Sequence, residues 1–167
     1  MNKMTTDEII SRLNLVPLVN EGGLVAQTYL SEETYENRRC GSAIYYFLTK
    51  DSFSHLHKLS ADEIWHYYYG DAVEILQIDD KTGQHKISKL GINLLDGETP
   101  QVLIRKNTWQ GARIKNGGAF GYTLMGTTMS PSYMEKDFIL GEQNEMLKRF
   151  PNISEEIKKF TGEKIYK

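Results

Sequence analysis

The alternation of apolar and polar residues along the chain predicts a protein built mainly from short β-strands. Most of the predicted segments have five to eight residues, rich in Val, Ile, Tyr, Phe or Thr, and turn-forming Gly, Asn and Asp residues separate them. The segments are 24–30, 42–48, 55–59, 63–69, 72–79, 85–90, 101–104, 108–114 and 121–128. Since no helical pattern lies between them, we expect an all-β fold, either an antiparallel sandwich or a barrel.

The two ends of the chain have a different pattern, which is typical of short helices. Thr5 and Glu8 have the spacing of a capping box ahead of a short apolar stripe, so we expect a helix over residues 5–14. Residues 141–160 are polar with few apolar positions, and we expect two short helices there on the outside of the protein. No linker or repeat divides the chain, which predicts a single domain over residues 1–167 with its core at about 20–140.

Composition and charge exclude several classes of protein. The chain has 167 residues, of which 40% are hydrophobic and 25% charged, a balance that argues against a disordered chain. Its formal net charge of −2 leaves no excess of positive charge for a nucleic-acid backbone. The single Cys, Cys40, excludes an internal disulfide, and no apolar run suits a signal peptide or a membrane span. We therefore expect a cytoplasmic protein that binds neither nucleic acid nor membrane.

The candidate chemistry lies in a cluster of His residues within the segment 54–70. His55 and His57 are two residues apart, so on a regular strand their side chains point to the same face. Glu63 follows a short turn, and we expect an adjacent antiparallel strand to bring it beside His57. A His and a carboxylate side by side make either half of a metal site or a general acid–base pair. The alternative is that neither residue is functional: His55 lies at the rim of the barrel, and Glu63 accepts a hydrogen bond from a backbone amide.

The same segment resembles the first sequence motif of the cupin superfamily, H-x-H-x3,4-E-x6-G. His57, Glu63 and Gly70 match this pattern, whereas Leu59 replaces the second His. The alternative alignment, which takes His55 and His57 as the pair, leaves too many residues before Glu63. We therefore prefer the alignment that begins at His57.

The second cupin motif, P-x-G-x2-H-x3-N, is matched in spacing only. Its four positions hold Arg105, Asn107, Gln110 and Ile114, of which Asn107 still suits a turn with positive φ. Further anchors are similar to those of a family of small uncharacterised cupins, cupin family 5, over residues from about 8 to 150. These anchors are Glu21-Gly22-Gly23, the segments 43–48 and 62–66, Gly70, Trp109-Gln110, Ser130-Pro131 and Asp137-Phe138.

This resemblance implies a cupin jelly-roll (double-stranded β-helix) barrel with short helices at both ends. Because small cupins usually pair, it also implies a homodimer. Metal-binding cupins offer three His and one Glu, whereas this chain offers His57, Glu63 and the amide oxygen of Gln110. Since two imidazoles are missing, we expect no cofactor, or at most a weakly bound divalent metal at these three residues.

The resemblance also suggests a chemistry that needs no metal. The dTDP-sugar epimerases are cupin-like, metal-free enzymes in which a His in the barrel lumen removes a proton next to a carbonyl. By this resemblance His57 is the base and Glu63 orients its ring. The acid is a Tyr, either Tyr122 or one of residues 67–69.

Further side chains are candidates for contact with a ligand in the lumen. Trp65, Trp109, Gln110 and His55 lie at or next to lumen positions, and aromatic walls suit an apolar or ring-shaped ligand, although both Trp also suit a core. On a regular strand the side chain of His66 points to the opposite face from that of Glu63. His66 is therefore either a packing or interface residue or a residue of the site.

These residues leave two functions open. The first is a small-molecule isomerase or epimerase with a His base. The second is a non-catalytic module that binds a carbohydrate-like or aromatic metabolite in the lumen. A metal-dependent oxygenase is disfavoured by Leu59 and Gln110, which replace metal-binding His residues.

Overall fold

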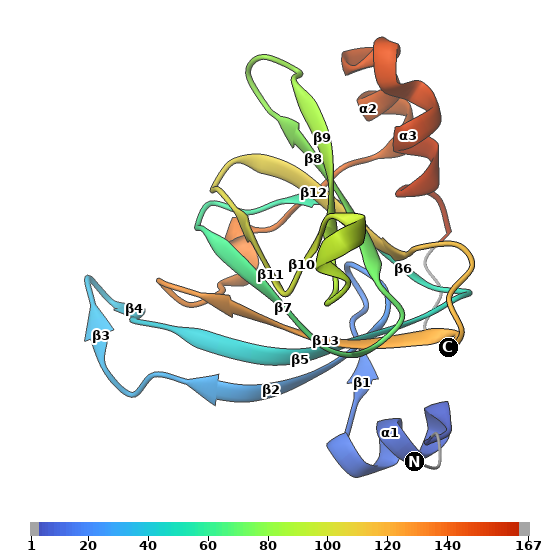
Figure 1. Cartoon of the computed structure of the whole chain (residues 1–167). Helices are drawn as coiled ribbons and strands as arrows, with labels where there is room; N and C mark the ends of the chain where they lie inside the picture. The colour runs from blue at the N-terminus through green and yellow to red at the C-terminus, as the bar shows by residue number, and fades with distance from the viewer. Residues whose placement is uncertain (1–3, 164–167) are drawn as a thin grey trace.

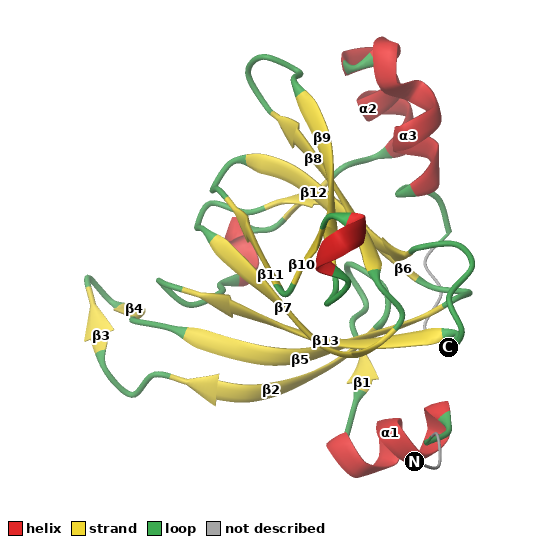
Figure 2. Ribbon diagram, in the orientation of Figure 1, coloured by secondary structure: helices red, strands yellow, loops and turns green. Residues whose placement is uncertain are grey.

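The computed structural model describes residues 4–163, and its main feature is a pair of β-sheets that face each other (Figures 1 and 2). All nine predicted segments form strands. Their bounds are β2 (Leu24–Leu30), β5 (Ser42–Thr49), β6 (Phe53–Lys58), β7 (Glu63–Gly70), β8 (Val73–Asp79), β9 (His85–Leu90), β11 (Gln101–Ile104), β12 (Thr108–Ile114) and β13 (Tyr122–Met129). Further strands of two residues, too short to give a sequence pattern, are β1 (Val16–Pro17), β3 (Thr34–Tyr35), β4 (Arg38–Arg39), β10 (Glu98–Thr99) and β14 (Ile139–Leu140).

The strands form two six-stranded sheets and one small ribbon. The first sheet has the order β1-β2-β5-β13-β7-β11, and the second has the order β10-β9-β8-β12-β6-β14. β3 and β4 form a ribbon of their own that projects from the side of the barrel (Figure 1). Consecutive strands such as β6 and β7 lie in different sheets, which is the arrangement of a jelly-roll barrel.

The space between the two sheets, here called the lumen, is filled at one end by apolar side chains. Leu48, Trp65 and Met125 of the first sheet pack with Ile75 and Leu90 of the second sheet, and each is at most 1% exposed. Complete burial of such a side chain contributes about 1.5–3 kcal/mol. This cluster joins the two sheets, while the other end of the lumen holds a cavity.

The N-terminal helix covers part of the outer face of the first sheet. In α1 (Thr6–Leu13) the predicted capping box is present, because the Glu8 N–H donates to the Thr5 hydroxyl and the Thr5 N–H donates to the Glu8 carboxylate. Ile9 is buried in a cluster with Phe47 and Tyr122, whose side chains leave the sheet on the side away from the lumen.

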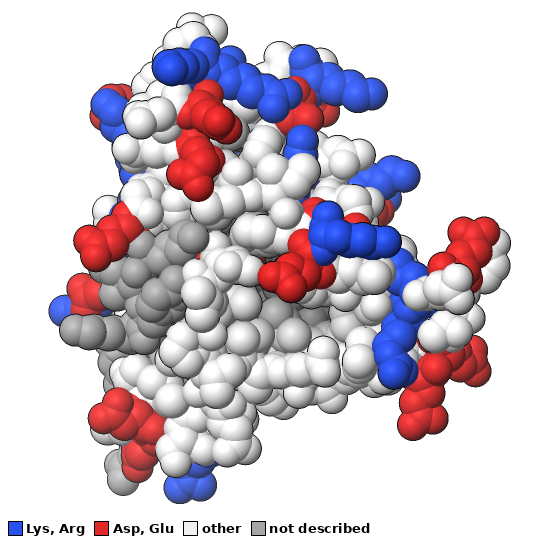
Figure 3. Space-filling model, turned by 180° about the vertical axis from the view of Figure 1, so that it is seen from behind, with Lys and Arg blue, Asp and Glu red and all other residues white. Residues whose placement is uncertain are grey.

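The C-terminal helices cover the outer face of the second sheet. The short 3-10 helices of the fold are η1 (Leu94–Asp96), η2 (Glu135–Asp137) and η3 (Pro151–Ile153). The two C-terminal helices are α2 (Gln143–Arg149) and α3 (Ser154–Lys159). They lie outside the barrel as expected, but Ile157 and Phe160 are completely buried against Leu56 and Leu76. From behind, charged side chains gather over these helices (Figure 3).

The loop before β2 runs so close to neighbouring strands that only glycine fits there. Gly22 has a φ of +104°, and a Cβ atom on it would lie 2.5 Å from the carbonyl oxygen of Phe53. The loop is anchored on both sides, since the His55 N–H donates to the Glu21 carbonyl and the Tyr46 hydroxyl donates to the Gly22 carbonyl, each at 2.8 Å. The Glu21 side chain is thereby held at a fixed place in the lumen.

We expect Gly22→Ala to destabilise the protein by more than Gly97→Ala does. Both glycines have positive φ, which costs another residue about 1–3 kcal/mol. A Cβ on Gly97 meets no atom within 4 Å, so its variant carries this cost alone. The Gly22 variant adds the clash with Phe53, worth about 1–3 kcal/mol more. Chemical denaturation of the two variants measures the difference, and equal losses would contradict the close approach.

Candidate functional site

A bulge in β6 decides which His enters the lumen. His57 pairs with Gln110 of β12, and Ser54 pairs with Ala112. The two residues between them on β6, His55 and Leu56, therefore lie opposite a single residue of β12, Gly111. Because of the extra residue, Ser54 and His57 both face the lumen, and His55 does not. The prediction that His55 and His57 share a face is therefore wrong, since the spacing rule holds only for a regular strand.

Glu63 reaches the lumen from the opposite sheet. It begins β7 and pairs with Met129 of β13 and Ile104 of β11, so the expectation that β7 lies beside β6 is wrong. Glu63 nevertheless lies close enough to His57 for the two side chains to interact electrostatically across the lumen.

A chain of hydrogen bonds holds the Glu63 carboxylate. The Gln110 amide donates from Nε2 to Oε2 of Glu63 at 2.6 Å, and Gln110 Oε1 accepts from Trp65 Nε1 at 2.9 Å. The Thr127 hydroxyl also hydrogen-bonds to Glu63. All four side chains are buried, so the carboxylate is fixed in position.

Glu21 is a functional candidate that the sequence analysis missed. The Ser54 hydroxyl donates to its Oε1, and its Oε2 lies 3.7 Å from Nε2 of His57. Its sequence signals are its place in the segment Glu21-Gly22-Gly23, which resembles the cupin family, and the Gly pair itself, which marks a loop close to other backbone. No spacing rule relates Glu21 to a His that lies 36 residues further along the chain and on another element.

The hydrogen bonds of His57 determine which of its nitrogens faces Glu21. Nδ1 lies 2.7 Å from the carbonyl oxygen of His55, and because a carbonyl only accepts, Nδ1 carries a hydrogen. In the neutral ring Nε2 is then the basic nitrogen. This nitrogen faces Oε2 of Glu21 at 3.7 Å, so the lone pair of the neutral ring is directed toward the carboxylate.

The two carboxylates have different electrostatic surroundings. Burial raises the pKa of Glu63 above its ordinary value, and the nearby charge of Glu21 raises it further, while His57 opposes the shift. Burial and the Glu21 charge also raise the pKa of Tyr46 and that of Tyr133. The lumen thus disfavours additional negative charge.

A cavity of about 630 Å³ opens at this end of the lumen. Glu21, Glu63 and Tyr133 are among its lining residues, and Tyr133 is 43% exposed. His57 is only 1% exposed and is not one of them, because the ring of Phe138 stacks on it at 5.2 Å. The apolar part of the wall comprises Leu13, Val16, Leu18, Val25, Ala26, Leu30, Ala43, Ile44, Leu59, Met129 and Phe138.

The structure corrects the predicted position of the Tyr acid. Tyr122 points away from the lumen into the cluster under α1, and its hydroxyl donates to the Met4 carbonyl at 3.1 Å. Tyr67 is on the lumen side, but it packs against the apolar core, donates its hydroxyl to the Gly70 carbonyl at 2.5 Å and does not line the cavity. Tyr69 contacts Phe120 and Tyr122 outside the lumen. These positions follow from strand parity and from the bulge in β7 opposite Leu124 and Met125.

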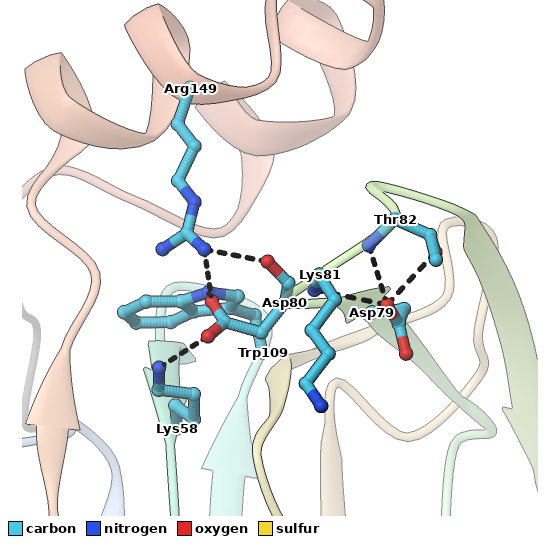
Figure 4. A network of polar contacts seen from close by, with 7 residues as sticks. All are labelled: Lys58, Asp79, Asp80, Lys81, Thr82, Trp109 and Arg149. Carbon is cyan, nitrogen blue, oxygen red and sulfur yellow. Dashed lines mark hydrogen bonds and ion pairs between the residues drawn. The ribbon is translucent and has the colours of Figure 1, made fainter.

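Trp109 also lies outside the lumen, which corrects its predicted contact with a ligand. It precedes Gln110 on β12 and therefore faces the C-terminal helices. Its Nε1 donates to Asp80, which also binds Lys58 and Arg149 at 2.8 Å each (Figure 4). Trp109 thus belongs to the network that ties α2 to the barrel. Trp65, in contrast, points into the lumen, but it packs in the apolar core there and is not among the residues that line the cavity.

His55 and His66 are not brought to the cavity either. His55 Nε2 accepts from the Gly162 N–H at 3.2 Å, at the C-terminal end of the described chain. His66 is on the outer face of β7, with Nε2 2.8 Å from the Thr128 hydroxyl and Nδ1 3.0 Å from the Gln101 amide nitrogen. The bulge in β6 accounts for the position of His55. His66 faces outward because its neighbour on β7, Trp65, faces the lumen.

The donor set at the motif positions does not fit a metal ion. The Gln110 oxygen is committed to Trp65, since the indole N–H can only donate, and its amide nitrogen is committed to Glu63. Leu59 supplies an apolar side chain where a metal-binding cupin has His. Within residues 4–163, no group of three or more His, Cys, Asp or Glu side chains is arranged to hold a metal.

We expect Glu63→Gln to raise the melting temperature, by more at pH 8 than at pH 5. Folding raises the pKa of Glu63 above its ordinary value of 4.5. The protonated carboxyl therefore favours the fold, and this contribution is lost as the pH rises through the raised pKa. The titratable groups that face Glu63 are Glu21, His57, Tyr46 and Tyr133. Calorimetry across this pH range measures the gain.

Glu98→Gln is the matched control for this prediction. Glu98 is also buried, but it accepts from the Asn93 N–H at 2.9 Å and lies 3.8 Å from Lys115. Its neutralisation removes an attraction rather than a repulsion, so we expect no gain. A Glu63 variant that is less stable than the parent at pH 8 would contradict the electrostatic account.

The comparisons with known proteins agree with this fold. A crystal structure of a protein from Shewanella oneidensis is 30% identical, with a TM-score of 0.88 over 95% of this chain and 98% of that one. A hypothetical protein from Leishmania major is 25% identical, with a TM-score of 0.88 over 96% and 100% of the two chains. No curated protein sequence matches the chain.

A more distant likeness is to a mutant of oxalate decarboxylase from Bacillus subtilis. It is 15% identical, with a TM-score of 0.55 over 87% of this chain and 37% of that one, which shows a shared fold alone. No helix in the described part of the chain is long and apolar enough to cross a membrane. The family model described as Cupin superfamily (DUF985) matches residues 7–141. The chain therefore belongs to this family of cupins, whose function is unknown.

Proposed function

We propose that this cupin binds a small molecule in the lumen cavity and moves a proton on it without a metal. The observation that carries the proposal is that Glu21 and Glu63 line one cavity in different surroundings. Glu63 is fixed by Gln110 and has a raised pKa, whereas Glu21 lies beside the basic nitrogen of His57. Pairs of titratable groups with such different surroundings are typical of acid–base sites.

In this proposal Glu21 is the group that touches the substrate, and His57 acts through it. A carbon next to a carbonyl loses its proton to the Glu21 carboxylate, and the electron pair of the C–H bond moves toward the carbonyl oxygen to give an enolate. His57 Nε2 accepts the proton or shares it with Glu21. Return of a proton to the same carbon, or to a neighbouring one, completes an epimerisation or an isomerisation.

The proposed acid is Tyr133 rather than Tyr122. Tyr133 lines the cavity together with Glu21 and Glu63, and it faces the charge of both. A phenol in this position can donate to the oxygen on which negative charge develops.

A second candidate function is non-catalytic binding of a small metabolite. It is favoured by the largely apolar wall of the cavity and by the stacking of Phe138 over His57. A wall of this kind suits tight burial of a ligand body. The two candidates share the cavity and differ in whether Glu21 exchanges a proton with carbon.

We expect the protein to incorporate deuterium at a carbon atom of one metabolite. A small-molecule cell extract is incubated with the protein in D2O and then returned to H2O, so that only carbon-bound deuterium is retained. Mass spectrometry then detects the labelled compound. We expect Glu21→Gln to lower the labelling rate by about 100-fold or more, as loss of a general base does.

His57→Gln and Trp109→Phe are the companion variants. His57→Gln should slow labelling less than Glu21→Gln and change its pH profile, because His57 acts through Glu21. Trp109→Phe should leave labelling unchanged, since Trp109 lies outside the lumen. If the parent protein produces no more deuterium labelling than the Glu21→Gln variant, catalysis is refuted and the binding function stands.

We also propose that two copies of the chain pair through the outer face of the first sheet. Part of this face is covered by α1, and the rest carries a continuous row of side chains across five strands. The row, given by the strand registers, is Tyr29, Ala43, Thr128, Ile64 and Leu103. Beside it, Tyr68 covers Gly126 and contacts Tyr45. Exposed apolar patches of this kind are typical of interfaces.

We expect Ile64→Lys to turn a dimer into a monomer in sedimentation velocity. Ile64 is 38% exposed and lies within the row, so a buried Lys would meet no partner charge. Leu95→Lys is the control, because Leu95 is 98% exposed on η1 and away from the row. A parent that sediments as a monomer would refute the pairing.

A further inference from the structure

We propose that the ligand of the lumen cavity carries a positively charged amine, whose ammonium group binds the Glu63 carboxylate. This inference rests on the proposed function of the cavity and names the class of molecule that it accepts.

The charged residues that line the cavity are acidic. Glu21 and Glu63 line the cavity, and among its described lining residues there is no Lys or Arg. The Arg residues of the adjoining ribbon are engaged elsewhere. Arg38 pairs with Asp137 at 2.6 Å, and Arg39 donates to the Ser31 carbonyl at 2.7 Å. An anionic ligand would therefore meet two carboxylates and no Lys or Arg, which disfavours its binding in a partly buried site.

Glu63 is built to receive a donor. It is only 6% exposed, it lines the cavity, and Gln110 and Thr127 fix its orientation from the lumen side. An ionised carboxylate accepts about four hydrogen bonds, so capacity remains after these two. A primary ammonium group supplies three N–H donors and the positive charge that the buried site lacks.

The wall beside the carboxylates suits a cation with an apolar body. Tyr133 and Phe138 line the same cavity, and the face of an aromatic ring attracts a cation. Val25, Ile44 and Met129 line it as well, and they offer surface for a hydrocarbon or ring portion of the ligand.

The two carboxylates then have separate tasks. Glu63 binds the ammonium group, and Glu21, with His57 behind it, faces the carbon that loses a proton. A positive nitrogen next to this carbon would also stabilise the negative charge that forms there. The resemblance to dTDP-sugar epimerases therefore does not extend to a nucleotide substrate, because its phosphates would lie against Glu21 and Glu63.

Three probes of similar shape and different charge test this inference by calorimetric titration. They are 2-phenylethylamine, 2-phenylethanol and phenylacetate, each titrated at neutral pH up to millimolar concentration. We expect the amine to bind at least about tenfold more tightly than the alcohol. We expect no measurable binding of phenylacetate.

Glu63→Gln separates a loss of charge recognition from a loss of folding. This variant should keep the fold, lose at least about tenfold in affinity for the amine, and keep its affinity for the alcohol within about twofold. Glu98→Gln, which neutralises a buried carboxylate that does not line the cavity, should leave all three affinities unchanged.

Equal binding of the amine and the alcohol, tighter binding of phenylacetate, or no binding of any probe would overturn the amine assignment. None of these results bears on deuterium labelling that depends on Glu21, so the proposed proton transfer would stand. Conversely, amine binding without labelling would refute the proton transfer and leave the ligand class in place.

Discussion

The burial of a carboxylate between two sheets is the constraint on which this site depends. Removal of Glu63 from water is expensive unless donors replace the lost hydration. Gln110 of β12 and Thr127 of β13 supply the replacement, and Trp65 of β7 holds the Gln110 amide in place. Because the donors belong to both sheets, the position of the carboxylate is linked to the closure of the barrel. Glu21 adds a second charge through a loop that only glycine allows.

The departures from the metal-binding cupin motif have a common consequence. Gln110 replaces a His with an amide, whose two ends can satisfy a carboxylate and an indole at the same time. Leu59 replaces another His and becomes part of the apolar cavity wall. The positions that hold a metal elsewhere in the superfamily thus serve here to orient one carboxylate and to shape the cavity.

The outer faces of the barrel use similar residue types for attachment. Trp109 joins the Asp80 network under α2, Tyr122 packs under α1, and His55 contacts the end of the chain. Each lies within a few residues of a lumen side chain on the same strand. The chemistry of a side chain therefore does not show on which side of the sheet it acts.

The sequence alone determined the strands, the capped first helix and the family, because these depend on local pattern and on motif spacing. It also identified His57, Glu63, Trp65 and Gln110 as lumen residues, because each of them lies on a strand that carries part of a cupin motif. It could not give the bulge in β6, which costs one unpaired residue and is not marked by Gly or Pro within β6 itself.

Only the tertiary structure decided the partners of these residues. It separated β6 and β7 into facing sheets, brought Glu21 to His57 and Tyr133 to the cavity, and turned His55 and Tyr122 outward. The physical reason is that these contacts join elements far apart in the chain. Their geometry follows from strand pairing and from backbone clearance at Gly22, and neither is encoded in a local pattern of residues.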